Sequence, residues 1–254
     1  MVLTALRGAL GFLTRLPVGG DEGSWSAFRR TPVSIPLAGY VVGALAALPL
    51  LLPLPVPSAA ALYLATLVLL TGVTHADGLA DVGDAAAVHG GSDVARRRDV
   101  LKDTQTGVGG ALAVSLAFVT LGLGALGLAG TLPRVAFALA LAAEVGAKAG
   151  VAFLVCTREA IHEGLGSALT EETTPTDLLP VVVAVLPVFV VASAAGAGYA
   201  GALGALLAPL GIAWLVGIWA RGALGGINGD VLGAANELGR VAGVHAGVIL
   251  WTLW

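Results

Sequence analysis

Six long apolar stretches alternate with polar segments along the chain and determine its predicted architecture. Each approaches the roughly 20 apolar residues that a helix needs to cross a bilayer. They predict membrane-spanning helices at residues 34–54, 58–74, 109–130, 134–155, 179–197 and 201–220. A shorter apolar stretch at residues 243–254 either forms a half-helix or extends back through the polar segment before it. The pattern predicts an all-α fold, a polytopic helical bundle in a membrane.

The connections between these helices alternate between two kinds. Short, nearly uncharged connections follow the first, third and fifth predicted helices. The remaining polar segments are longer and comprise residues 1–33, 75–108, 156–178 and 221–242. Helices that cross the membrane in alternate directions place all four segments on one side. Every lysine and arginine except Arg134 and Lys148 lies in these segments, so the positive-inside rule predicts that this side of the cell membrane is cytoplasmic.

Composition supports a single integral membrane domain over residues 1–254. Hydrophobic residues make up 57% of the chain and charged residues 11%, whereas a soluble domain is roughly a quarter charged. A net charge of −3 argues against a nucleic-acid partner. The apolar residues at the N-terminus are interrupted by an arginine and are not typical of a signal peptide. Residues 1–33 could instead form a re-entrant or interfacial helix, which the sequence leaves open. The sequence also leaves open whether the chain forms a homo-oligomer.

The segment THADGLADVGDA, residues 74–85, places three aspartates directly after the second predicted membrane helix. Asp77, Asp81 and Asp84 have the spacing i, i+4, i+7, which puts them on one face of a helix. Oxygen ligands of this kind suit Mg²⁺, or Mn²⁺, better than zinc. His75 is close enough in sequence to act as a proton shuttle. The alternative interpretation is a solvated loop with ordinary surface aspartates.

Further polar groups accompany the aspartates. A basic cluster that ends at Lys102 and is followed by Asp103 suits a metal-bound diphosphate, although basic runs beside membrane helices are also common topology signals. Asp230 lies in a glycine-rich stretch, where a turn before a helix can present amide groups to an anion. Glu144 and Lys148, spaced i, i+4 in the fourth predicted helix, either neutralise each other or contribute to a site.

Six ordered motifs resemble the cobalamin synthase family, the adenosylcobinamide-GDP ribazoletransferases. HADGLADVGDA at residues 75–85 is similar to the family signature HxDGLADxxDG. The other matches are FLTRLPVG at 12–19, SIPLAGYVVGA at 34–44, LKDTQTGVGGALA at 101–113, EGLG at 163–166 and GGINGDVLGAANEL at 225–238. The chain departs from the family pattern at Ala85, Gln105, Lys148 and Asn228, which affects the expected phosphate contacts but no acidic position.

The resemblance implies a phosphoryl transfer that joins adenosylcobinamide-GDP to α-ribazole or its 5′-phosphate, releases GMP and requires Mg²⁺. It implies a metal site of Asp77, Asp81 and Asp84, completed by Asp103 or Asp230. One carboxylate or His75 would take the proton from the attacking hydroxyl. The substrate-binding residues that we expect are Arg15, Arg98, Lys102, Lys148, Glu163, Asn228 and Glu237.

Two other functions fit parts of the sequence. A CDP-alcohol phosphotransferase of lipid synthesis also uses an aspartate-rich helix and Mg²⁺, but DGLAD lacks the arginine and spacing of its signature. A membrane transporter would use Glu144 and Lys148 as part of a pathway. It would also place polar residues at mid-membrane in several helices, whereas here they gather toward one face.

Overall fold

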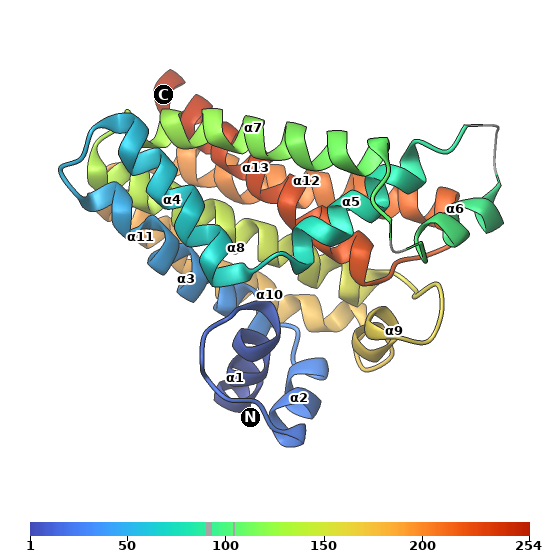
Figure 1. The fold of residues 1–254 in the computed structure, drawn as a ribbon. Coiled ribbons are helices and arrows are strands. Elements are labelled where there is room, and N and C mark those ends of the chain that lie inside the picture. The colour runs from blue at the N-terminus through green and yellow to red at the C-terminus, as the bar shows by residue number, and fades with distance from the viewer. Residues whose placement is uncertain (90–92, 104) are drawn as a thin grey trace.

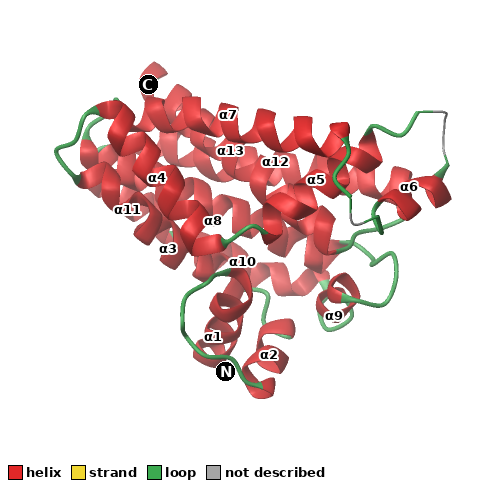
Figure 2. Cartoon of the chain, in the orientation of Figure 1, coloured by secondary structure: helices red, strands yellow, loops and turns green. Residues whose placement is uncertain are grey.

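The computed structural model describes residues 1–89, 93–103 and 105–254. Residues 90–92 and 104, which belong to the predicted polar segment 75–108, lie outside the described residues. Long helices run side by side in a bundle, and short helices gather at one end and along one side (Figure 1). Within the described ranges all regular elements are helices, apart from one isolated bridge between Ala160 and Ile227 (Figure 2).

The six predicted membrane helices are confirmed as helical elements. They correspond to α3 (Ser34–Ala47) with the 3-10 helix η1 (Leu48–Leu51), α4 (Val56–Thr71), α7 (Val108–Ala129), α8 (Pro133–Thr157), the pair α10 (Leu178–Val185) and α11 (Pro187–Ala195), and α12 (Gly198–Leu224). Among the described residues, five helical segments are long and apolar enough to cross a membrane, or six if α4 and the next helix form one bent span. The chain is therefore a polytopic helical membrane protein.

Helix α8 is the centre of the bundle, and small residues let its neighbours approach it closely. Gly39 and Gly43 of α3 have the small-xxx-small spacing that is typical of membrane helix contacts. A Cβ atom at these positions would lie 3.0 Å from the Cα atoms of Val145 and Leu141, respectively. This close packing leaves α8 almost entirely buried among α3, α12 and the last helix.

The last helix, α13 (Gly229–Leu253), corrects the prediction that residues 221–242 form a polar connection. Only residues 225–228 separate α12 from α13, and the final apolar stretch extends back through the polar segment. Glu237 and Arg240 are buried in this helix, and they pair with each other. Because partners within the bundle compensate these charges, this polar part of the sequence forms a helix that packs inside the bundle.

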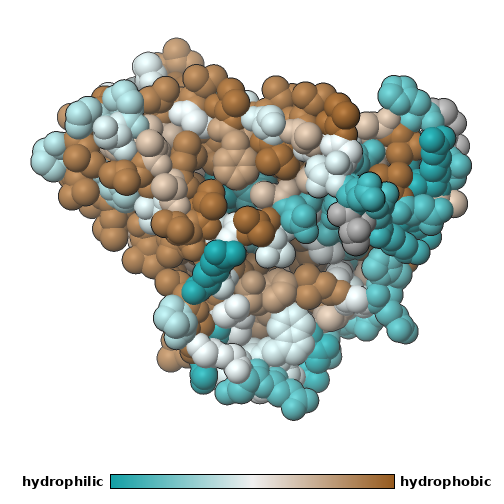
Figure 3. Space-filling view, viewed as in Figure 1, coloured by the Kyte–Doolittle hydropathy of each residue, from teal (hydrophilic) through white to brown (hydrophobic). Residues whose placement is uncertain are grey.

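Short helices build the polar end of the molecule. The chain bends by 92° between α4 and α5 (Thr74–Ala86) at Gly72, whose φ of +69° favours glycine. Helices α6 (Val94–Val100) and α9 (Leu165–Thr170) lie beyond this bend, and α1 (Val2–Leu13) and α2 (Glu22–Arg29) pack along the side. In Figure 3, hydrophilic residues gather around α5, α6 and α9, while the rest of the visible bundle is mostly hydrophobic.

Candidate active site

A cavity of about 290 Å³ lies where the short helices meet the bundle. Each of the four predicted polar segments contributes to its lining. Representative lining residues are Phe12 from the first segment, Asp77 from the second, His162 from the third and Asp230 from the fourth. Segments that are far apart in the sequence therefore share one enclosed space, as the alternating topology predicts.

Two close backbone contacts hold α5 against the first turns of α13. A Cβ atom at Gly78 would lie 2.8 Å from the Cα of Asp230, and one at Gly233 would lie 3.1 Å from the carbonyl oxygen of His75. These glycines allow the two helices to approach far more closely than larger residues would. The approach brings the carboxylates of α5 beside Asp230, and both Asp77 and Asp230 line the cavity.

Asp230 is positioned by the local structure at the start of α13. Asn228 is the N-cap residue, and its Oδ1 accepts a hydrogen bond from the backbone N–H of Val231 at 3.0 Å. Its Nδ2 donates to Asp230 Oδ2 at 2.6 Å. Asn228 therefore caps the start of α13 and orients the carboxylate of Asp230. The sequence did not predict this orienting role.

Burial, together with nearby like charges, raises the pKa of two carboxyl groups at this position. Burial, reinforced by the nearby Asp230, Asp77 and Asp84, raises the pKa of Asp81 to about 6 from an ordinary value of 3.8. Burial, with a smaller contribution from Asp77, also raises the pKa of Asp230. Closely placed carboxylates that resist ionisation are typical of sites that receive a cation.

Asp84 has a different environment from the other two aspartates of α5. Its Oδ2 accepts a hydrogen bond from the backbone N–H of Gly107 at 2.7 Å, and its Oδ1 accepts one from Gly110 at 2.8 Å. Because free amide groups at a helix N-terminus favour a negative charge, this carboxylate fastens α5 to the start of α7. Asp84 does not line the cavity that Asp77 and Asp230 share.

The carboxylate oxygens near the cavity suit a hard divalent cation, but the side chains alone do not form a complete metal-binding site. Among the described residues, no group of three or more His, Cys, Asp or Glu side chains lies close enough together to hold a metal ion. Mg²⁺ is usually held by one or two carboxylates, with substrate phosphates and water supplying the other ligands. Two carboxylates, Asp77 and Asp81, fit that manner of binding, and the Mg²⁺ site stays a prediction.

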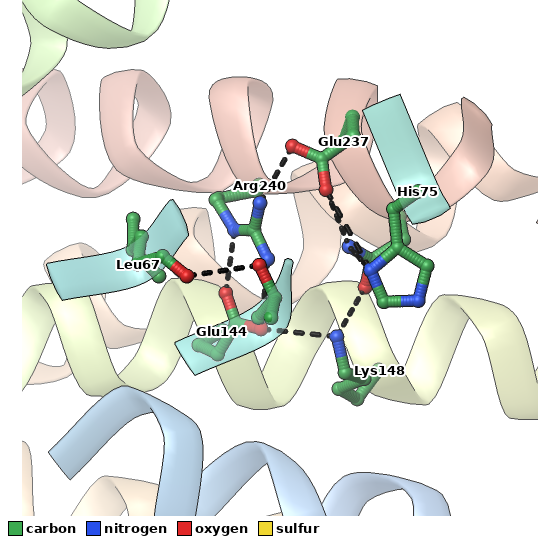
Figure 4. Close-up of polar contacts among 8 residues, drawn as sticks. Leu67, His75, Glu144, Lys148, Glu237 and Arg240 are labelled. Carbon is green, nitrogen blue, oxygen red and sulfur yellow. Dashed lines mark hydrogen bonds and ion pairs between the residues drawn. The ribbon is translucent and has the colours of Figure 1, made fainter. Parts of the chain in front are cut away.

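A buried ion network adjoins the cavity (Figure 4). Lys148 Nζ donates to Glu144 Oε1 at 3.1 Å, as the i, i+4 spacing predicts, and to Asn236 Oδ1 at 2.6 Å. Arg240 donates from Nε to Glu144 Oε2 at 2.7 Å and from Nη1 to Glu237 Oε2 at 2.6 Å. Two carboxylates and two cations thus balance each other inside the bundle, consistent with the neutralisation that the sequence suggests for Glu144 and Lys148.

The network also indicates which ring nitrogen of His75 carries the proton. Lysine only donates hydrogen bonds, so the oxygen of the Asn236 amide must face Lys148. The amide Nδ2 then faces Glu237 Oε1 at 3.0 Å and His75 Nδ1 at 3.4 Å. A neutral His75 that accepts at Nδ1 carries its proton on Nε2. His75 in this form can donate a hydrogen bond from Nε2, and it is among the residues that line the cavity.

Several predicted substrate-binding residues lie outside this cavity. Arg98 donates from Nε to the carbonyl oxygen of Leu224 at 2.7 Å and so covers the end of α12. Lys102 and Asp103 are exposed on the segment after α6, and Glu163 is exposed before α9. The exposed side chain of Arg15 lies next to Gly72 at the bend before α5. For these positions, a substrate role remains a prediction.

Sequence reasoning missed the partner that completes the network. Arg240 contacts both Glu144 and Glu237, yet it was not among the predicted site residues. Its i, i+3 spacing from Glu237 was a signal that the segment continues as a helix. The contact to Glu144, 96 positions away, depends on the packing of α8 against α13 and leaves no local pattern.

Comparisons with known proteins agree with the motifs. The family model described as cobalamin-5-phosphate synthase matches residues 5–248. The chain is 52% identical to the adenosylcobinamide-GDP ribazoletransferase of Haloquadratum walsbyi over the full length of both chains. It is 51% identical to that of Halorubrum lacusprofundi over 99% of each chain, and 35% identical to that of Klebsiella pneumoniae over 92% of this chain and 94% of the other.

No solved structure matches the chain. The family match and the relatives nonetheless cover nearly all of its residues, including the segments that line the cavity. The chain therefore belongs to the cobalamin-5-phosphate synthase family and is a transferase of cobalamin biosynthesis.

Proposed function

We propose that the chain joins adenosylcobinamide-GDP to α-ribazole or α-ribazole 5′-phosphate, with release of GMP. The names of its full-length relatives supply the substrates. The observation that carries the proposal is the cavity, since carboxylates from α5 and α13 line a space that also has an apolar side. Such a space can hold an aromatic acceptor next to groups that bind phosphate and transfer a proton.

The reaction is a substitution at phosphorus. A ribose hydroxyl attacks the phosphorus that carries the cobinamide, a new P–O bond forms, and the bond to the GMP oxygen breaks. Asp77 and Asp81 would hold Mg²⁺, which supplies positive charge against the diphosphate when it is bound. Asp84 would keep α5 in place through the amide groups of Gly107 and Gly110.

The cavity also offers groups for proton transfer. We assign Asp230 to accept the proton of the attacking hydroxyl, because it lines the cavity and Asn228 orients its carboxylate. A neutral His75 with its proton on Nε2 would have a donor available, and Lys148 has a third N–H beyond the two that Glu144 and Asn236 accept. These donors suit the hydroxyl and phosphate oxygens of the substrates.

The protein in lipid vesicles, given adenosylcobinamide-GDP, α-ribazole and Mg²⁺, is expected to release GMP, and removal of divalent cations should stop the release. Asp81→Asn should lower turnover by at least about 100-fold, the range found when one charged catalytic group is removed. Asp99→Asn, at an exposed position on α6, is the matched control and should keep normal turnover. Absence of GMP from folded wild-type protein would refute the proposed reaction.

The proposal includes a location. The distribution of lysine and arginine favours the cell membrane with the cavity opening toward the cytoplasm. The hydrophobic surface of the bundle would then lie in the bilayer, and water-soluble substrates would reach the polar end directly.

A further inference from the structure

The cavity has two walls of different chemistry. One wall is formed by α1, α2, α3 and α9 and presents apolar side chains, among them Phe12, Phe28, Ile35 and Leu169. The other wall is formed by α13 with α5 and α8, both of which pack against α13, and these three helices carry most of the polar lining groups. A ligand that fills this space must therefore be amphipathic, with an apolar end under α1 and α2.

The size of the cavity limits the class of ligand. Its volume of about 290 Å³ is at the lower end of the range of about 300–1,000 Å³ for small-molecule sites. A corrin macrocycle that carries a nucleotide cannot enter a space of this size. A fused-ring aromatic base attached to one pentose is of a suitable size, with its hydroxyl groups at the polar wall.

Aromatic side chains give the apolar wall a defined shape. The ring centroids of Phe12 and Phe28 are 5.7 Å apart, and that of Trp25 lies 5.4 Å from Phe12 and 5.7 Å from Phe28. Phe28 is fully buried, whereas Phe12 is 37% exposed although it lines the cavity. An aromatic ring left partly uncovered beside an apolar space is suited to stack on a planar ligand.

The helices that carry these rings are fixed to each other and to the bundle. A Cβ atom added at Gly8 of α1 would lie 2.9 Å from the Cβ of Phe28 on α2, so the two helices pack closely. The backbone N–H of Arg15 donates to the carbonyl oxygen of Leu70 at 2.7 Å, which ties the segment after α1 to α4. These contacts hold the apolar wall over the cavity.

We propose that this cavity is the acceptor subsite, in which the aromatic base of α-ribazole lies under Phe12 and Phe28 and its ribose faces Asp77 and Asp230. This inference rests on the proposed function and adds the place of one substrate. The cobinamide-bearing substrate then stays outside the cavity and presents its diphosphate at the carboxylates. In this arrangement the two substrates meet at the carboxylates, where the ribose hydroxyl of the acceptor faces the phosphorus of the diphosphate.

Leu169→Trp tests the proposal, because Leu169 is 3% exposed and lines the apolar wall. We expect the KM for α-ribazole to rise at least about tenfold, with the KM for adenosylcobinamide-GDP nearly unchanged. Leu203→Trp, at a 41% exposed position of α12, is the matched control and should change neither. An unchanged KM for α-ribazole, or equal increases for both substrates, would overturn the proposal.

Phe12→Ala provides a second test that does not depend on overpacking the core, because Phe12 is already partly exposed. It should weaken the binding of α-ribazole alone, measured by equilibrium dialysis, by roughly tenfold, while unaltered binding would contradict the subsite. This binding is measured without the second substrate. If the wild-type protein binds α-ribazole but releases no GMP, the proposed reaction fails and the subsite stands.

Discussion

Arg240 joins the two carboxylates of the buried network. It bonds to Glu144 on α8 and to Glu237 on its own helix, and it is 3% exposed. Burying a charge is costly unless its partners compensate it. Removal of this one guanidinium would leave two buried carboxylates short of a partner, and we expect it to cost more stability than the loss of a single apolar contact.

We expect Arg240→Met to lower the free energy of unfolding by about 3–5 kcal/mol, the cost of leaving buried charges without a partner. Arg7→Met is the matched control, because Arg7 pairs with Asp21 at 3.5 Å where both side chains are largely exposed. Reactivity of the buried Cys156 toward a thiol probe during heating reports unfolding. Equal stability of the two variants would show that the network does not stabilise the fold.

The carboxylates near the cavity predict a dependence of stability on pH. The pKa of Asp81 is raised from 3.8 to about 6 by burial and by Asp230, Asp77 and Asp84, so the fold favours its protonated form. The stability that this group contributes is complete below 3.8 and is lost as the pH rises through 6. Above that pH, without a divalent cation, an ionised Asp81 destabilises the protein.

Asp81→Asn should accordingly raise the Tm by about 2 °C at pH 8 in a chelating buffer, and the difference from wild type should shrink as the pH falls toward 4. Added Mg²⁺ should raise the Tm of the wild type at pH 8 and have less effect on the variant. A stabilising effect of the substitution that is the same at pH 8 and pH 4 would contradict the assigned pKa.

At the scale of elements, the contact between α5 and α13 positions the site. Alanine is favoured over glycine inside a helix by about 1 kcal/mol, yet a Cβ at Gly78 would lie 2.8 Å from the Cα of Asp230. We therefore expect Gly78→Ala to lower both the Tm and turnover, the latter by about tenfold or more because misplacement of reacting groups is costly.

Gly222→Ala is the control for this contact, because nothing lies within 4 Å of a Cβ atom added at Gly222 of α12. It should keep turnover and leave the Tm equal or slightly higher. Both variants are compared by thermal unfolding and GMP release in the same vesicles. If Gly78→Ala behaves like Gly222→Ala, the close approach of α5 and α13 does not position the carboxylates.

The same elements show how far sequence reasoning reaches. Apolar runs of suitable length identified the membrane helices, and the aspartate spacing correctly favoured a helix at α5. The polar segment 221–242 could not be recognised as mostly helical by hydropathy, because Glu237 and Arg240 are compensated partly by Glu144 on another helix. The hydrogen bonds of Asp84 to Gly107 and Gly110 likewise depend on tertiary packing.

At the scale of the whole molecule, the alternation of charged and uncharged connections predicted that the polar segments share one region. In the structure, Phe12, Asp77, His162 and Asp230, one from each segment, line the same cavity. Its shape was not predictable, since it depends on how the N-terminal helices α1 and α2 lie over the bundle. The apolar pattern of a short helix indicates which face packs, but not the angle at which the helix lies on its neighbours.

The orientation in the membrane can be tested with single cysteines. Cys156 is the only cysteine, so Cys156→Ala provides a background for Asp93→Cys, just before α6, and Leu132→Cys, just before α8. The membrane helix α7 separates these exposed positions. In sealed inside-out vesicles, an impermeant maleimide should label position 93 directly and position 132 only after detergent is added. Labelling of both without detergent would contradict the alternating topology, and the reverse pattern would place the cavity on the outer face.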